Sequence, residues 1–128
     1  MSKTAKMLSV IFAGLFLLAG CTTTTSSQTN NDDQSPADYT IELSSFKFSP
    51  NLIEANPGQT IKVRLSNLSG EHDFVIDELN VRSELLGAGD SQTIEIKIPE
   101  AASGKIYEFY CAVSNHRAMG MVGTLRIK

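Results

Sequence analysis

FYCAVSNHRAMGMVG, residues 109–123, places a thiol, an imidazole and a thioether within one short segment, at Cys111, His116 and Met121. The apolar run Ile106–Tyr110 precedes these residues and Gly123–Lys128 follows them, and both runs are predicted to be strands. The three side chains are therefore expected on a loop that turns one strand back into the next. Because sulfur is a soft ligand and imidazole binds transition metals, this set favours copper over magnesium, calcium or manganese.

A second imidazole would complete the donor set of a blue-copper site, which is one Cys, two His and a weak axial Met. The sequence contains two His and two Cys in total. His72 is therefore the one candidate for the missing imidazole, and Cys111 is the one thiol near His116. The alternative interpretation of Cys111 is a buried, unreactive thiol.

Apolar and polar residues alternate along several short segments outside this loop. The alternation is clearest in Tyr39–Leu43, Ile61–Leu65 and Ile94–Ile98, and a period of two indicates half-buried strands. Further strands are predicted at Leu52–Ala55, His72–Ile76, Lys105–Cys111 and Gly123–Lys128, whereas Asn80–Leu86 is ambiguous and could form a helical turn. Seven or so short strands without a long helical pattern predict an all-β protein, an antiparallel β-sandwich.

The segment from Phe109 to Gly123 resembles the C-terminal copper loop of the cupredoxins, the type 1 blue copper proteins. Its flanks are similar to plastocyanin, and its Cys-x4-His-x4-Met spacing is closer to auracyanin and rusticyanin. Upstream, Glu71–Phe74 resembles the strand that carries the first ligand, and Pro57–Thr60 resembles a family turn. The resemblance covers residues 39–128. It implies a Greek-key cupredoxin fold, electron transfer as the usual activity, and one type 1 copper ion bound by His72, Cys111, His116 and Met121.

The resemblance leaves two roles open for each of three further residues near the ligands. The family spacing favours Met121 over Met119 as the axial ligand, which leaves Met119 as a loop residue near His116 or as packing. Asp73 stands where relatives often carry an Asn that holds the Cys loop, and its negative charge would favour Cu(II); it could equally be a solvated residue at a strand edge. Asn115 could donate to the Cys111 sulfur or simply form the turn.

The resemblance also suggests where electrons would enter and leave. His116 is expected near the surface, with Arg117 and Met119 in a docking patch around it. Tyr110 resembles the second electron port of plastocyanin, and its alternative interpretation is an ordinary exposed aromatic on a strand.

The N-terminus predicts export and lipid anchoring. Lys3 and Lys6 precede an apolar run, Met7–Ala19, that is short for a membrane-spanning helix and is typical of a signal peptide. Leu18–Cys21 resembles the bacterial lipobox, so we expect removal of residues 1–20 and lipidation of Cys21. Residues 21–37 would form a flexible tether, and residues 38–128 the cupredoxin domain. The domain would lie in the cell envelope, facing the periplasm or the exterior, with acyl chains anchoring it to a membrane.

Composition and residue counts argue against several other functions. The net charge is −3, and loss of Lys3 and Lys6 would leave nine basic and fourteen acidic side chains, which disfavours nucleic acid as a partner. No His remains free to act as a catalytic base, so we do not expect an enzyme. Redox proteins are the expected partners of a monomer. Periplasmic copper binding or delivery is the main alternative, and a purely structural sandwich is a third.

Overall fold

Strict alternation of apolar and polar residues produces the longest strand of the molecule, β4 (Thr60–Asn67), in which Ile61, Val63 and Leu65 are fully buried. In the computed structural model, which describes residues 36–128, β4 lies in a four-stranded sheet with the order β2-β1-β4-β7. The other strands of this sheet are β1 (Tyr39–Ser44), β2 (Lys47–Ser49) and β7 (Ser91–Lys97).

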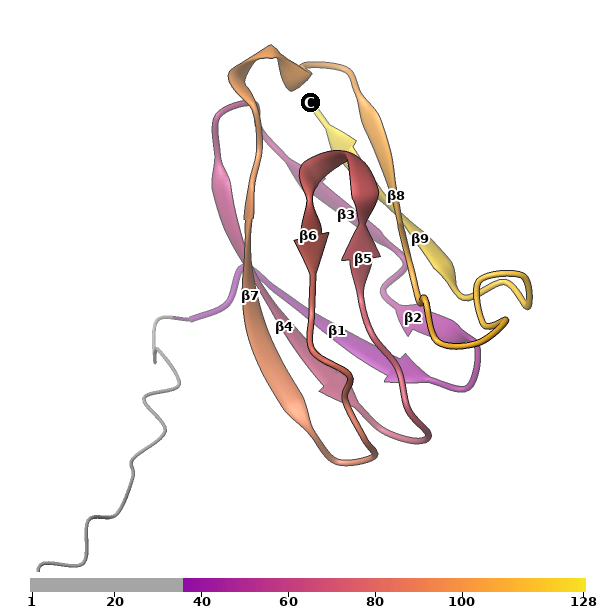
Figure 1. The fold of residues 1–128 in the computed structure, drawn as a ribbon. Coiled ribbons are helices and arrows are strands. Elements are labelled where there is room, and N and C mark those ends of the chain that lie inside the picture. Colours follow the sequence, from indigo (N-terminus) through magenta and orange to yellow (C-terminus); the bar gives the residue numbers. More distant parts are fainter. Residues whose placement is uncertain (1–35) are drawn as a thin grey trace, which may run out of the picture. The chain divides into compact units, whose positions relative to one another are not determined.

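The second sheet has five strands in the order β3-β9-β8-β5-β6. These are β3 (Leu52–Ala55), β5 (Val75–Ile76), β6 (Val81–Arg82), β8 (Ile106–Tyr110) and β9 (Val122–Ile127). Two short 3-10 helices, η1 (Asp77–Leu79) and η2 (Glu100–Ala102), connect strands. The inward faces of the two sheets share a single apolar core, and Figure 1 shows the resulting sandwich.

Three phenylalanines from different parts of the chain pack together in this core. The rings of Phe74 and Phe109 stack with their centroids 4.8 Å apart, and Phe48 meets both of them edge to face. Gly123 lies against the Phe109 ring, and a Cβ at this position would overlap that ring. Glycine is therefore required where β9 leaves the loop. This packing joins Phe74, two residues after His72, to Phe109, two residues before Cys111.

The all-β sandwich is confirmed, with differences in detail from the sequence-based prediction. Two of the strand pairs, β1 with β4 and β3 with β9, are parallel, so both sheets are mixed. The strand expected at His72–Ile76 is shorter, because only Val75–Ile76 pairs continuously, and His72 forms an isolated bridge with Leu86. The segment Asn80–Leu86, left open as a helical turn, contains β6 instead.

The predicted signal peptide, the lipidation site Cys21 and most of the tether lie outside the described residues. They remain predictions. Within residues 36–128, none of the helices is both long enough and apolar enough to cross a bilayer.

Candidate metal centre

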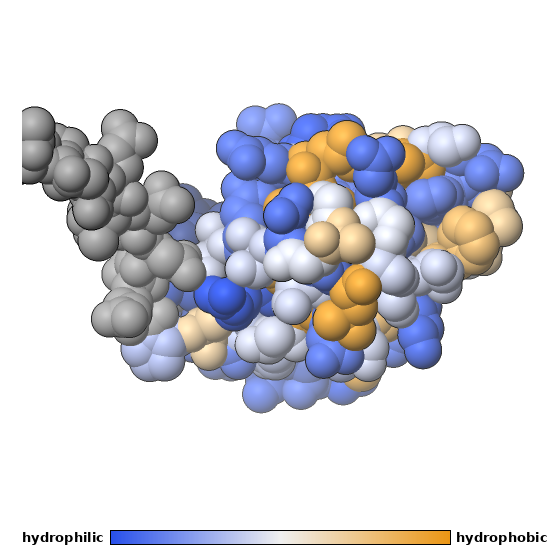
Figure 2. Space-filling model, turned by 90° about the horizontal axis from the view of Figure 1, so that it is seen from below, coloured by the Kyte–Doolittle hydropathy of each residue, from blue (hydrophilic) through white to orange (hydrophobic). Residues whose placement is uncertain are grey.

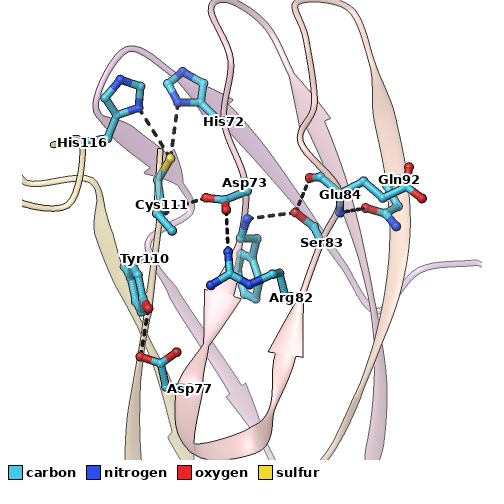
Figure 3. Close-up of polar contacts among 12 residues, drawn as sticks. His72, Asp73, Asp77, Arg82, Ser83, Glu84, Gln92, Tyr110, Cys111 and His116 are labelled. Atoms are coloured by element: carbon cyan, nitrogen blue, oxygen red, sulfur yellow. Dashed lines mark hydrogen bonds and ion pairs between the residues drawn. The ribbon is translucent and has the colours of Figure 1, made fainter. Parts of the chain in front are cut away.

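The structure brings together the imidazoles of His72 and His116 and the thiol of Cys111. Their potential ligand atoms all lie within 4.8 Å of one another. The Cys111 Sγ is 3.8 Å from His72 Nδ1 and 3.5 Å from His116 Nδ1, and the centroids of the two imidazole rings are 5.0 Å apart. As Figure 3 shows, both rings point their Nδ1 atoms at the sulfur. Residues separated by 39 positions in the sequence thus converge on one point.

These separations match those around a single metal ion. Typical bonds of about 2.0 Å to imidazole nitrogen and about 2.3 Å to thiolate sulfur, at tetrahedral to trigonal angles, hold N and S about 3.5–3.7 Å apart. The observed distances from the Cys111 sulfur, 3.5 Å to His116 Nδ1 and 3.8 Å to His72 Nδ1, bracket this range. Met121 is fully buried, and its backbone is hydrogen-bonded to Cys111 and His116, so the arrangement of the four residues fits one type 1 copper ion.

Tertiary contacts hold the His72 segment in place. The His72 backbone N–H donates to the Leu86 carbonyl at 3.0 Å, and the Leu86 N–H returns a bond to the His72 carbonyl at 2.9 Å. Asn67, at the end of β4, donates through Nδ2 to the carbonyls of Gly70 and Leu86, both at 2.8 Å. His72 is only 2% exposed, and its backbone is held by pairing with Leu86, which Asn67 also bonds.

The loop that joins β8 and β9 is held mainly by its own backbone. The His116 carbonyl accepts the N–H groups of Met119 and Met121, and the Met121 carbonyl accepts the Cys111 N–H at 3.2 Å. Gly120 has φ +95°, a left-handed conformation that favours glycine. The loop therefore closes on itself and fixes its three sulfur and nitrogen donors relative to one another.

Met121 and Met119 differ sharply in exposure. Met121 is fully buried, and its backbone is bonded to both Cys111 and His116, whereas Met119 is 49% exposed. These positions favour Met121 as the thioether ligand and leave Met119 at the surface beside His116.

Burial shapes the acid–base properties of two donors. Burial lowers the pKa of His72 below its ordinary value, and the neighbouring His116 lowers it further. Both causes favour the neutral imidazole, which is the form that binds metals. Burial raises the pKa of the Cys111 thiol, while backbone N–H groups of Asp73 and Val113 that bond to the sulfur act in the opposite direction. The net effect raises the pKa and favours the neutral thiol, so metal binding would release its proton.

Asp73 is not a solvated edge residue. Its side chain is only 10% exposed, its Oδ1 accepts the Ala112 N–H at 2.6 Å, and its Oδ2 lies 3.0 Å from Arg82 Nη1. Asp73 thereby links the His72 segment to the start of the Cys111 loop, as Figure 3 shows. Arg82 was missed by the sequence analysis, because no local pattern connects β6 with Asp73.

Tyr110 and Arg117 form a second polar cluster at the end of the loop. The Arg117 guanidinium carbon lies 3.8 Å from the centroid of the Tyr110 ring, and Arg117 also donates to Glu108 Oε1. The Tyr110 hydroxyl donates to Asp77 Oδ2 at 2.9 Å, and this hydrogen bond raises the pKa of Tyr110. Arg117 and Tyr110 are thus engaged within the molecule, although the Arg117 side chain stays half-exposed.

His116 lies at the edge of an open pocket of about 240 Å³ that His72 also lines. Phe46, in the turn between β1 and β2, meets the His116 ring edge to face with centroids 5.1 Å apart. Phe46 was not predicted, since the sequence analysis gave no role to the Ser45-Phe46 turn. The exposed side chains of Phe46, Leu68, Leu85 and Met119 all lie outside the strands. Figure 2 views the molecule from below and shows separate apolar areas among polar ones.

Asn115 is exposed, and its carbonyl accepts the Met119 N–H at 3.0 Å. It therefore takes part in the turn, which is one of the two roles considered for it.

The family and the fold are independently supported by comparison with known proteins. A family model described as a cupredoxin-like domain matches residues 11–123, and no curated protein matches the chain. The fold is similar to a dithionite-reduced auracyanin from the photosynthetic bacterium Roseiflexus castenholzii, with 23% identity and a TM-score of 0.62 over 70% of this chain and 95% of that one. Auracyanin A, a "blue" copper protein from Chloroflexus aurantiacus, has 16% identity and a TM-score of 0.58, and the match covers 70% of this chain and 96% of that one. Auracyanin B has 17% identity and a TM-score of 0.58, and the match covers 73% of this chain and 91% of that one.

Proposed function

Because the chain belongs to the cupredoxin-like family, we propose that it is a type 1 copper protein that carries single electrons and converts no substrate. The observation that supports this most strongly is the convergence of His72, Cys111 and His116, whose ligand atoms lie within 4.8 Å of one another. When bound, the copper ion would alternate between Cu(I) and Cu(II).

In this proposal His72, Cys111 and His116 would hold the copper ion through Nδ1, Sγ and Nδ1, and Met121 would add a weak thioether donor. The backbone N–H groups of Asp73 and Val113 donate to the Cys111 sulfur and stabilise its negative charge. Met119 is not a ligand.

The supporting argument for electron transfer is that contacts within the protein hold the donors in place. His72 is held by its backbone bonds to Leu86, and the loop donors are held by hydrogen bonds within the loop. Ligands that cannot rearrange keep the same positions in both oxidation states, so little reorganisation accompanies each electron transfer. Such a site also retains its metal, which distinguishes it from an open, exchangeable copper-delivery site.

We propose that electrons pass through the exposed edge of His116. This imidazole is half-buried at the pocket edge and lies close to the exposed Phe46 and Met119. Tyr110 is a less suitable second port, since Arg117 covers one face of its ring. The partners would be redox proteins that offer an apolar docking surface.

We also propose that the protein is lipid-anchored at Cys21 in the bacterial cell envelope. Support comes from the signal-like segment 1–20 and the lipobox-like Leu18–Cys21. Metabolic labelling with a radioactive fatty acid tests this: the wild-type chain should incorporate label, and Cys21→Ser should not. Equal labelling of both chains would contradict the anchor.

Cyclic voltammetry of the copper-loaded protein tests the electron-carrier role, combined with a challenge by a weak copper chelator. We expect a reversible one-electron wave and full retention of copper. An irreversible wave would contradict electron transfer, and rapid loss of copper to the chelator would favour the alternative of copper binding and delivery.

A further inference from the structure

One carboxylate joins the two segments that carry the proposed ligands. Asp73 directly follows His72, and Ala112 directly follows Cys111. Asp73 Oδ1 accepts the Ala112 N–H at 2.6 Å, a short, charge-assisted bond. Because this bond connects residues 39 positions apart, it fixes the spacing between the two segments directly beside their ligands.

A buried negative charge at this position has a cost. The Asp73 side chain is only 10% exposed, and its bond to Ala112 holds its charge directly beside the Cys111 segment. An uncompensated carboxylate would also stabilise Cu(II) over Cu(I), because the oxidised ion carries one more positive charge. An asparagine could make the same bond to Ala112 without this charge.

Arg82 compensates the charge from the solvent side. Its Nη1 lies 3.0 Å from Asp73 Oδ2, and its side chain is 57% exposed. Arg82 lies on β6 opposite Val75 of β5, so the sheet itself holds the guanidinium next to the segment that follows Asp73. Figure 3 shows the carboxylate between the Cys111 loop and Arg82. One oxygen therefore binds the loop while the other binds the counter-charge.

We propose that Asp73 and Arg82 act as a charge-compensated staple: the carboxylate positions the Cys111 loop against the His72 segment, and the guanidinium cancels its effect on the reduction potential of the copper. This inference rests on the proposed function. Both residues are positioning residues and neither contacts the metal. The proposal assigns Arg82, an exposed residue on an edge strand, a role in setting the potential.

The reduction potentials of four variants test the charge compensation. Arg82→Gln should shift the potential downward, Asp73→Asn should shift it upward, and the double variant should return close to wild type, because both charges are then absent. Arg82→Lys should retain the wild-type potential. Arg126→Gln is the matched control: it removes the same charge from the pair with Glu54, near the end of β9 that is distant from Met121, and should leave the potential unchanged. Equal potentials for Arg82→Gln and Arg126→Gln would overturn the proposal.

Amide hydrogen exchange in the metal-free protein tests the positioning role without copper. Loss of the bond in Asp73→Ala should speed exchange at Ala112 about tenfold, the factor that corresponds to one ordinary hydrogen bond. Asp73→Asn should keep the protection, because its amide oxygen still accepts. Unchanged exchange in Asp73→Ala would overturn the staple. A wild-type chain that takes up no copper would instead overturn the proposed function, and the exchange result would still decide the positioning role.

Discussion

The two segments that supply the proposed ligands are stabilised in opposite ways. His72 is almost fully buried, and its backbone pairs with Leu86, fourteen residues later in the chain, whose carbonyl also accepts a hydrogen bond from Asn67. The loop from Cys111 to Met121 is held by hydrogen bonds within itself, and its His116 is half-buried at the pocket edge. The His72 segment therefore depends on pairing with another segment, whereas the loop makes most of its backbone hydrogen bonds internally.

This difference separates two tasks within a single site. The buried segment provides a ligand that is almost fully enclosed, and the loop provides a ligand edge that a partner can approach. The Asp73–Ala112 bond connects the two segments, so neither can shift without the other.

The largest expected effect comes from removing either imidazole. Both His72→Gly and His116→Gly should lose the intense visible absorption of the copper–thiolate site. Added imidazole should restore it more readily in His116→Gly than in His72→Gly, because both side chains line the same pocket but His72 is only 2% exposed whereas His116 is half-buried. The visible absorption of each variant, followed while imidazole is added, measures this recovery.

Equal recovery in both histidine variants would contradict the contrast in accessibility between the two segments.

A smaller effect is expected from the two methionines of the loop. Met121→Leu should keep the colour but shift the reduction potential upward, since loss of a weak sulfur donor destabilises Cu(II) more than Cu(I). Met119→Leu, at the exposed position, is the matched control and should leave the potential unchanged. Voltammetry measures the reduction potential of each variant. A shift found only in Met119→Leu would identify Met119, and not Met121, as the ligand.

The tertiary support of His72 predicts a change in stability. Asn67→Ala removes two hydrogen bonds, to the Gly70 and Leu86 carbonyls, each of which contributes about 0.5–1.5 kcal/mol to stability. Asn115→Ala, in the exposed loop turn, should change stability by less than about 0.5 kcal/mol. Urea unfolding of the metal-free proteins gives both values. A loss in Asn115→Ala as large as in Asn67→Ala would show that the loop is not independently held.

The smallest effect is expected from the side-chain contacts of the loop. Arg117→Gln breaks an exposed ion pair with Glu108, in which the two side chains are 52% and 46% exposed. Such pairs contribute at most about 1 kcal/mol, and salt screens them. Thermal unfolding at low and high salt should show a small loss that shrinks as salt is added. A large, salt-independent loss would mean that the loop needs Arg117 more than its own backbone bonds.

The same contrast explains what could be predicted from the sequence. Cys111, His116 and Met121 stand close together, so their spacing alone indicated a copper loop. His72 was assigned only because no other His was available, and the family resemblance supported it. The alternation around Ile61–Leu65 predicted a half-buried strand because one face of each sheet is apolar.

Other features depended on contacts that no local pattern encodes. Arg82 reaches Asp73 across two strands, and Phe46 reaches His116 from a turn about seventy residues earlier in the chain. The parallel pairing of β1 with β4 likewise follows from how the sheets close, and the alternation of either strand is compatible with both directions. The short edge strand β2 lacks a pattern long enough to detect.

X-ray absorption spectroscopy at the copper edge tests the central claim most directly, because it measures the donors around copper in both oxidation states. The account predicts one short sulfur and two nitrogen neighbours for Cu(II), and the same set with nearly the same distances after reduction. A copper environment of oxygen neighbours, or a change in the number of ligands on reduction, would contradict a site that the fold assembles in advance.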